Sequence, residues 1–326
     1  MNRTDVLSVI GAWPSVVGLR RAGAAMLERH GHRLGLWLAL GAAFGFSFKA
    51  IFVKLAYAVP QAVPVDAVTL LSLRMVFALP VFLWVGFHSS RAAPPLSRRD
   101  WLLLTALGLL GYYGASILDF VGLRYITAGL ERLILFTYPG LTLLFGVAFF
   151  GKRLVARDIA ALALTSIGIA AAFAHDLHVS GAADTVWLGA ALVFASSLSY
   201  AVYLVGGGEL IARLGSARFA ALAMAVATTA VLLHFAVTRP WAELFAQPWP
   251  VVGYAAAMAL FSTVIPVFMQ SAAIRHIGAG RAAMVGMLGP VATIFLAWWW
   301  LDEAMSAWQI GGAALVIAGV GLIGRR

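Results

Sequence analysis

The sequence predicts an all-α integral membrane protein of ten transmembrane helices, arranged as two inverted five-helix repeats. Three observations lead to this fold class. The chain of 326 residues is 62% hydrophobic and 11% charged, against roughly 45–50% and 25% in soluble domains. Its apolar residues form continuous runs instead of the alternating pattern of membrane strands. Its second half also resembles its first half at one fixed offset, which indicates an internal repeat.

Ten apolar runs are long enough, or nearly so, to cross the hydrocarbon core, which takes about 20 helical residues. They cover residues 34–57, 66–87, 101–123, 128–150, 155–174, 185–206, 216–237, 251–274, 280–301 and 306–323. The first five predict a first repeat at residues 34–175, and the last five a second repeat at residues 185–326. Residues 1–33 form a basic tail whose short apolar stretch is broken by Trp13 and Pro14. That break favours a cytoplasmic tail, or a surface-lying helix, over a cleaved signal peptide.

The basic residues predict the orientation, because cytoplasmic loops of membrane proteins are enriched in Lys and Arg. With a cytoplasmic N-terminus, the inside segments hold Arg3, Arg20, Arg21, Arg29, Arg33, Arg91, Arg98, Arg99, Lys152, Arg153, Arg157, Arg213, Arg218, Arg275, Arg281, Arg325 and Arg326. The outside segments hold only Arg124 and Arg239. We therefore expect a multi-pass protein of the cell (inner or plasma) membrane, with both termini in the cytoplasm. The net charge of +10 does not predict a nucleic-acid partner, because the basic residues are spread over alternate loops.

The repeat is clearest around the fourth and ninth predicted helices, at an offset of 151 residues. Arg124, Ile126, Ala128, Gly129, Pro139 and Thr142 correspond to Arg275, Ile277, Ala279, Gly280, Pro290 and Thr293. Five helices is an odd number, so the second repeat would cross the membrane inverted relative to the first. In such folds bent helices meet at a midplane site. Pro139 and Pro290 lie near mid-span and predict helix kinks, which either belong to such a site or serve packing alone.

Ionisable residues inside the predicted spans are the first candidates for function, because burying each one in a bilayer costs about 2.5–3.5 kcal/mol. Lys49, Arg74, Asp119, Glu131 and Arg132 all fall in the outer half of the first repeat. Apart from Arg218 and Arg281, which are counted above with the inside segments, the spans of the second repeat contain only His234. The charged contacts are therefore expected to come from one repeat.

Helical spacing adds polar residues to these candidates. Thr105, Gly108, Tyr112, Ser116 and Asp119 recur every three or four residues and predict one polar face on the third helix. Glu131, Tyr138 and Thr142 do the same on the fourth helix, and Tyr200 lies on the sixth. Arg132 is about 100° round from Glu131 and is expected to face elsewhere or extend outward. The predicted substrate-binding set is Lys49, Arg74, Tyr112, Ser116, Asp119, Glu131, Tyr138, Thr142 and Tyr200.

Two interpretations of the charged residues remain open. In the first, Lys49 and Arg74 hold a carboxylate of a substrate, while Asp119 or Glu131 meets an amine or carries a coupling proton. In the second, the four side chains neutralise one another and stabilise the repeat. The second interpretation carries more weight for Arg74 than for Lys49, which lies deeper in its span. For the tyrosines a core or interfacial position is the more common alternative.

The best-matching runs resemble the EamA domains of the drug/metabolite transporter (DMT) superfamily. They are LERLILFTYPGLTLLFGVAFFGK at residues 130–152, IGAGRAAMVGMLGPVATIFLAWWWLDE at 277–303 and GLWLALGAAFGFSFKAIFVKLAY at 35–57. The resemblance covers residue 34 to the end. It implies ten helices, cytoplasmic termini and export of small metabolites.

The chain departs from the usual pattern of that family in two places. Gly151-Lys152 and Asp302-Glu303 stand where Gly-Glu is often found after the fourth and ninth helices. The first helix reads FGFSF followed by Lys49, where Trp-Gly-Ser-Asn-Phe is often found. Because members carry diverse cargo, the resemblance does not name the substrate.

A secondary transporter working by alternating access is the favoured function. A channel-like facilitator would need rings of equivalent groups. A membrane-embedded enzyme would need a nucleophile and base, or metal ligands. The chain has no cysteine, and His175, Asp176 and His178 are expected in a solvated outer loop, so we assign no catalytic residues and no metal. No phosphate-binding GxxxxGK[ST] motif occurs. The expected partners are a small-molecule substrate, the lipid bilayer and, from the resemblance, protons, with no cofactor. Amino-acid-like or organic-anion cargo also follows from the resemblance alone.

Overall fold

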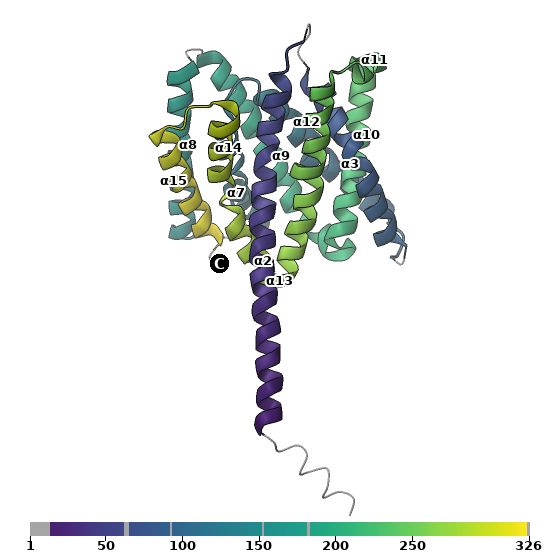
Figure 1. Cartoon of the computed structure of the whole chain (residues 1–326), viewed down its shortest axis with the longest axis vertical. Helices are drawn as coiled ribbons and strands as arrows, with labels where there is room; N and C mark the ends of the chain where they lie inside the picture. Colours follow the sequence, from purple (N-terminus) through teal and green to yellow (C-terminus); the bar gives the residue numbers. More distant parts are fainter. Residues whose placement is uncertain (1–13, 62–64, 92, 152, 181–182, 325–326) are drawn as a thin grey trace, which may run out of the picture.

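The computed structural model describes residues 14–61, 65–91, 93–151, 153–180 and 183–324. This part of the chain contains helices and no strands. The helices form one bundle, from which the N-terminal part of α2 (Pro14–Tyr57) projects along its own axis (Figure 1). Residues 14–33 of the predicted tail are therefore helical and continuous with the first span, whereas residues 1–13 lie outside the described part.

The first half of the bundle contains α3 (Ala67–Ser90), α4 (Arg98–Gly108), η1 (Leu109–Gly114), α5 (Ala115–Gly122), α6 (Ala128–Leu135), α7 (Tyr138–Phe150) and α8 (Ala156–Ser180). The second half contains α9 (Ala183–Leu214), α10 (Ser216–Thr238), α11 (Trp241–Phe245), α12 (Trp249–Ala259), η2 (Leu260–Val264), α13 (Ile265–Gly286), α14 (Gly289–Leu301) and α15 (Ala307–Gly324). The elements η1 and η2 are π-helices, in which each turn carries an additional residue.

Eight spans in the described residues are long and apolar enough to cross a membrane. They are Arg33–Tyr57, Ala67–Ser90, Arg98–Gly122, Ala128–Phe149, Ala156–His175, Ala183–Gly208, Ser216–Thr238 and Trp249–Gln270. The last two predicted spans correspond to shorter apolar helices, Gly289–Leu301 and Ala307–Leu322. The connection expected near residues 275–279 is wrong, because α13 continues through it to Gly286. Helix length therefore supports eight spans and leaves the count of ten as a prediction.

Polar side chains fix where several helices begin. The Asp66 carboxylate accepts hydrogen bonds from the N–H groups of Val68 (2.8 Å) and Thr69 (3.1 Å), which caps α3. Ser97 and Asp100 form a reciprocal capping box at α4. The Thr127 hydroxyl accepts from the N–H of Leu130 (3.1 Å) at α6. Each cap satisfies N–H groups that lack a partner within the helix.

The helix boundaries repeat at the offset of 151 residues that the sequence shows. The elements α4, η1, α7 and α8 begin at residues 98, 109, 138 and 156, and α12, η2, α14 and α15 begin at 249, 260, 289 and 307. The helix ends before residue 151 and before residue 302 also match, with left-handed backbone at Gly151 (φ 62°) and Asp302 (φ 52°). The internal repeat is therefore present in the backbone as well as in the sequence.

Both prolines of the repeat follow a break in a helix. Turns at residues 136–137 and 287–288 separate α6 from α7 and α13 from α14, and Pro139 and Pro290 are each the second residue after the break. Pro139 has no N–H to offer the carbonyl of Leu135. That carbonyl instead accepts a hydrogen bond from the Ser197 hydroxyl of α9 (3.1 Å). A helix of the second half thus compensates for the break in the first.

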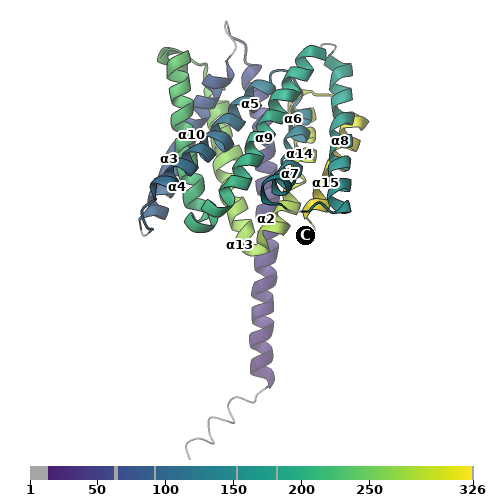
Figure 2. The ribbon, with the colours of Figure 1, turned by 180° about the vertical axis from the view of Figure 1, so that it is seen from behind.

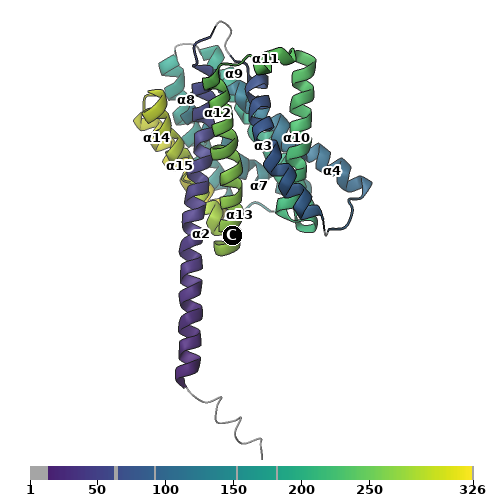
Figure 3. The same ribbon diagram turned by 45° about the vertical axis from the view of Figure 1, so that its right-hand side comes forward.

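The two halves pack mainly against each other. The closest helix pairs are α2 with α13, α3 with α10, α5 with α9, and α8 with α15. Figure 3 shows α3 beside α10, and Figure 2 shows α5 beside α9. The largest hydrophobic core, which includes Ile51, Met75, Phe120, Phe235 and Met258, draws side chains from both halves. Side chains of the first half therefore meet partners from the second.

Candidate functional site

An ion cluster joins three helices of the first half. Lys49 Nζ on α2 lies 2.7 Å from Asp119 Oδ2 on α5 and 2.9 Å from Glu131 Oε1 on α6. Asp119 is 2% exposed and Glu131 is fully buried. The sequence predicted that these residues share a region of the bundle, and here they bind one another directly.

The ion cluster contains two carboxylates for one lysine. The second oxygens, Asp119 Oδ1 and Glu131 Oε2, are buried and have no hydrogen-bond partner among the described residues. Two buried carboxylates this close cannot both be compensated by a single ammonium group. The cluster is therefore suited to taking up a proton or a cationic group such as a substrate amine.

Arg74 on α3 lies outside these ion pairs although it is only 7% exposed. Its Nε donates to Thr263 Oγ1 of η2 (3.3 Å), and its guanidinium carbon lies 5.5 Å from the centre of the Phe120 ring. Its Nη1 is buried without a hydrogen-bond partner in the described part of the chain. No carboxylate described here lies within ion-pair distance of it. Mutual neutralisation therefore accounts for Lys49 better than for Arg74, the reverse of the order expected from sequence.

The candidate tyrosines Tyr112, Tyr138 and Tyr200 form a second group together with Tyr203. The ring of Tyr200 lies 5.3 Å from Tyr138 and 5.6 Å from Tyr203, and Tyr203 lies 5.2 Å from Tyr112. The Tyr203 hydroxyl donates to that of Tyr112 (3.1 Å). A side chain at Gly111 would overlap the Tyr203 ring, so glycine is needed for this close packing. The group joins η1 and α7 of the first half to α9 of the second.

The continuous polar face predicted for the third helix is wrong. The π-helix η1 interrupts it and rotates the residues that follow relative to those before. Tyr112 therefore contacts Tyr203, whereas Asp119 contacts Lys49. Ser116 is half-buried on α5, and Thr142 is half-buried with its hydroxyl bonded to the Tyr138 carbonyl (2.7 Å). The single predicted site is thus divided into an ion cluster and a tyrosine group.

Among the described residues, Arg132 makes no ion pair with Glu131 and lies against Phe136, which agrees with the first of its two expected directions, and the outward extension given as the second is wrong. Its guanidinium carbon lies 5.5 Å from the centre of the Phe136 ring. A Cβ atom at Gly289 would lie 3.0 Å from Arg132 Nη2, so the guanidinium occupies space next to the start of α14. The missing side chain at Gly289 makes this inward position possible. Because Gly289 belongs to the other half, spacing along the fourth helix alone could not predict the contact.

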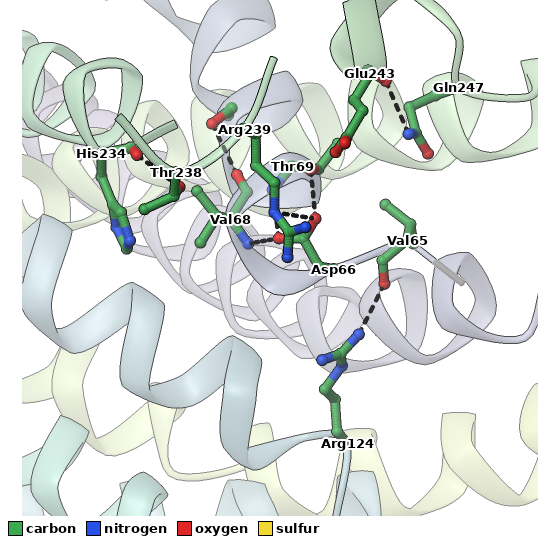
Figure 4. A network of polar contacts seen from close by, with 11 residues as sticks. Val65, Asp66, Val68, Thr69, Arg124, His234, Thr238, Arg239, Glu243 and Gln247 are labelled. Atoms are coloured by element: carbon green, nitrogen blue, oxygen red, sulfur yellow. Dashed lines mark hydrogen bonds and ion pairs between the residues drawn. The ribbon is translucent and has the colours of Figure 1, made fainter. Parts of the chain in front are cut away.

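A cavity of about 370 Å³ opens near the end of α2 and is lined by Lys54, Tyr57, Ala58, Val65, Leu123 and Arg124. Beside the cavity, a network of polar contacts joins residues of both halves at this end of the bundle (Figure 4). Arg124 donates to the Val65 carbonyl (3.1 Å), and Arg239 Nε lies 3.5 Å from Asp66 Oδ2. The Tyr57 hydroxyl bonds the carbonyl of Phe120 (2.7 Å), next in sequence to Asp119. The cavity is therefore close to the helix that carries part of the ion cluster.

Sequence reasoning missed two contact residues, Thr263 and Glu303. Thr263 bonds Arg74, and Glu303 accepts from the N–H of Ala128 with both carboxylate oxygens (3.1 and 3.0 Å). Tyr203, a polar residue of the sixth predicted helix outside the predicted substrate-binding set, bonds Tyr112. The offset of 151 residues matches Thr263 with Tyr112, so the repeat itself could have identified Thr263. In the described part of the chain no three His, Asp or Glu side chains gather as a metal site requires.

Comparisons with known proteins identify the family. A model of the EamA-like transporter family matches residues 33–174 and again residues 187–325. An uncharacterized transporter of Bacillus subtilis (strain 168), YcbK, is 31% identical over 283 residues, which cover 84% of this chain and 88% of the relative. A protein of Streptantibioticus cattleyicolor named a probable terminal-alkyne amino-acid exporter is 25% identical over 234 residues, or 70% and 74% of the two chains.

A solved structure described as "Crystal structure of protein" has a similar fold, with a TM-score of 0.58 and 19% identity. The likeness covers 88% of this chain and 95% of that one.

The relatives are named as transporters, and the apolar helices make this a multi-pass membrane protein. Two matches to one family model, together spanning nearly all of the bundle, lead to one conclusion: the chain belongs to the EamA-like transporter family.

Proposed function

We propose that the protein is a secondary transporter that exports small metabolites by alternating access. The observation that carries this proposal is the ion cluster, in which the two buried carboxylates Asp119 and Glu131 share Lys49. Such a group can exchange a proton or an amine as the surrounding helices move. Buried polar atoms usually have hydrogen-bond partners, so the two carboxylate oxygens without one among the described residues favour an exchangeable group over an ion pair that serves structure alone.

We further propose ten spans in two inverted repeats. The break before α14 divides the ninth helix as the break before α7 divides the fourth, so α13, α14 and α15 supply the last two spans. In support, α2 runs toward the end of the bundle that carries α11, and α9 runs away from it (Figures 1 and 2). Rocking of two such repeats would expose the ion cluster to either side in turn. The distribution of basic residues favours cytoplasmic termini in the cell membrane.

The cargo we propose is amino-acid-like or a small organic anion. The name of the Streptantibioticus relative supports the first of these. Asp119 and Glu131 would take the amine or a coupling proton, and the tyrosine group would line part of the path. A channel-like facilitator is less suited to this arrangement, because the charged side chains of the ion cluster come from one repeat and form no ring.

The test uses the full chain in two settings. Media from cells with and without overexpression are compared for small metabolites, and the enriched compounds are then assayed in proteoliposomes with and without an imposed pH gradient. We expect saturable flux that responds to the gradient in the wild type and is lost in Glu131→Gln. The control Glu243→Gln makes the same chemical change on the short helix α11, and it should leave flux unchanged. No metabolite accumulating in the medium and no flux in vesicles would together reject export.

A further inference from the structure

We propose that Arg74 forms a buried binding site for the carboxylate of a small organic ligand, with Thr263 of the second half as its positioning residue. This inference rests on the proposed transport function, because it names the group that would hold the anionic part of the cargo. It is carried by the surroundings of Arg74, which differ from those of Arg218, an arginine that is buried to a similar extent.

Arg74 is a permanent cation in a place without a matching anion. A guanidinium remains ionised in proteins, so it cannot lose its charge when buried. Burial of a charge is costly unless the charge is paired and hydrogen-bonded. The described surroundings offer Arg74 a neutral hydroxyl from Thr263 and the face of the Phe120 ring. Neither supplies negative charge, and the Asp119 carboxylate attracts the guanidinium only from beyond ion-pair distance.

Arg218 shows what a structural buried arginine looks like in the same protein. It is 6% exposed, almost as buried as Arg74. Its Nε donates to Ser90 Oγ and its Nη2 to the Pro94 carbonyl, both at 3.1 Å. No nitrogen of Arg218 is among the buried groups without a partner, whereas Nη1 of Arg74 is. Burial alone therefore does not produce the unpaired nitrogen at Arg74.

Thr263 fixes the direction of the guanidinium. Its hydroxyl donates to the Met258 carbonyl (3.2 Å), five residues earlier, and accepts from Arg74 Nε. The wider turn of the π-helix η2 brings that carbonyl within reach. Because the hydroxyl proton is already used, Thr263 orients Arg74 and does not itself donate to a ligand. The Nη edge is left for a carboxylate, which a guanidinium binds with two parallel hydrogen bonds.

Asp119 provides a way to distinguish two kinds of carboxylate ligand. Asp119 directly precedes Phe120, whose ring centre lies 5.5 Å from the guanidinium carbon of Arg74. The Oδ1 atom of Asp119 has no hydrogen-bond partner among the described residues. A simple carboxylate would satisfy Arg74 alone. A ligand that also carries an ammonium group could satisfy Asp119 Oδ1 as well, and it should then bind more tightly than the simple carboxylate.

The experiment measures thermal unfolding of the purified full chain in detergent, as a function of sodium acetate, glycine or methylammonium chloride. Sodium chloride holds the ionic strength constant. We expect acetate and glycine to raise the unfolding temperature in the wild type through Arg74, whereas a response to methylammonium would come from the carboxylates of the ion cluster and should not require Arg74. Half-saturation by acetate should weaken about ten- to a hundredfold in Arg74→Gln, which is the effect of losing one charge-assisted pair of about 1.5–3 kcal/mol. Arg74→Lys should restore part of the response, and Thr263→Val should weaken it by about tenfold or less.

Arg99→Gln is the matched control, since it makes the same change at an exposed arginine on α4, and its acetate response should equal that of the wild type. Equal responses in the wild type and Arg74→Gln would overturn the proposal. If Arg74→Gln does not fold, the proposal would instead be overturned by an acetate response in Arg74→Lys and Thr263→Val that equals the response of the wild type. Recovery of folding on adding Asp119→Asn would show that Arg74 is a structural partner of Asp119, which also contradicts a ligand site.

This binding assay does not depend on flux. An acetate response that requires Arg74, in a protein that moves no metabolite in vesicles, would retain the site and reject the transporter. Gradient-dependent flux that is unchanged in Arg74→Lys and Thr263→Val, with no acetate response in the wild type, would retain the transporter and reject the site.

Discussion

The two halves of the molecule share a backbone plan but differ in chemistry. The π-helices, the breaks before Pro139 and Pro290 and the left-handed residues at helix ends recur at an offset of 151 residues. At the same offset Asp119 corresponds to Gln270 and Glu131 to Ala282. The first half therefore supplies the buried charges of the site. Because the helix breaks and π-helices occur in both halves, their presence does not depend on the buried charges, which occur in the first half.

The second half contributes neutral groups to the same contacts. The Thr263 hydroxyl meets Arg74, the Ser197 hydroxyl meets the free carbonyl of Leu135, and the Gly289 carbonyl accepts from Ser47 (3.1 Å). Hydroxyls and carbonyls can satisfy polar groups of the first half without adding a charge that would itself need compensation. The comparison suggests that one half carries the charge and the other orients it.

The largest effect is expected from removing the only cation of the ion cluster. Lys49→Met leaves two buried carboxylates without their shared ammonium group, and we expect the free energy of unfolding to fall by about 3–5 kcal/mol. Thermal or denaturant unfolding in detergent measures this. Lys54→Met, which removes the half-buried partner of Glu303 at 4.0 Å, should cost about 1 kcal/mol or less.

The double variant Lys49→Met/Glu131→Gln tests the cause of that loss. It makes the cluster more like the corresponding positions of the second half, where Gln270 and Ala282 carry no charge. It should recover part of the lost stability because one of the two buried charges is removed. A double variant as unstable as Lys49→Met would contradict the charge imbalance and point to lost packing of the lysine stem instead.

A smaller effect is expected where the second half compensates for the break in the first. Ser197→Ala removes the hydrogen bond to the Leu135 carbonyl, and we expect it to cost about 1 kcal/mol in unfolding. In a Pro139→Ala background the restored N–H can bond that carbonyl, so the cost of Ser197→Ala should shrink. A double-mutant cycle measures the difference. Equal costs of Ser197→Ala in both backgrounds would mean that the serine does not substitute for the missing N–H.

Sequence reasoning identified the parts of the fold that depend on local pattern. The apolar runs predicted the helices, and the offset of 151 residues predicted where Pro139 and Pro290 interrupt them. A connection near residues 275–279 was predicted wrongly, because the glycines and basic residues around it resemble a loop, whereas α13 passes through this segment. Helix ends of this kind depend on tertiary packing as well as local propensity.

The candidate site was only partly predictable for a related reason. The residues of the ion cluster could be selected because burying an ionised side chain in a membrane has a high free-energy cost. Their pairing could not be predicted in the same way, because it depends on how α2, α5 and α6 pack together. Tyr112 and Asp119 were assigned to one face because a regular α-helix was assumed, and the π-helix η1 separates them. The position of Arg132 depends on the absent side chain of Gly289. The sequence of one helix cannot indicate a contact that it makes with a residue of the other half.

The smallest expected effect concerns a pair of matched helix ends that have the same left-handed backbone but different residues. Gly151 and Asp302 both have positive φ (62° and 52°) at the end of a helix. A non-glycine residue pays about 1–2 kcal/mol in this region, and aspartate less than most, because its short polar side chain tolerates it. Gly151→Asp should therefore destabilise the protein by about 1 kcal/mol, and Asp302→Gly should stabilise it by about 0.5–1 kcal/mol, as measured by unfolding in detergent. The paired substitutions are each other's control, since both sites are exposed. Loss of stability in Asp302→Gly would show that the carboxylate, and not the backbone, determines how the ninth helix ends.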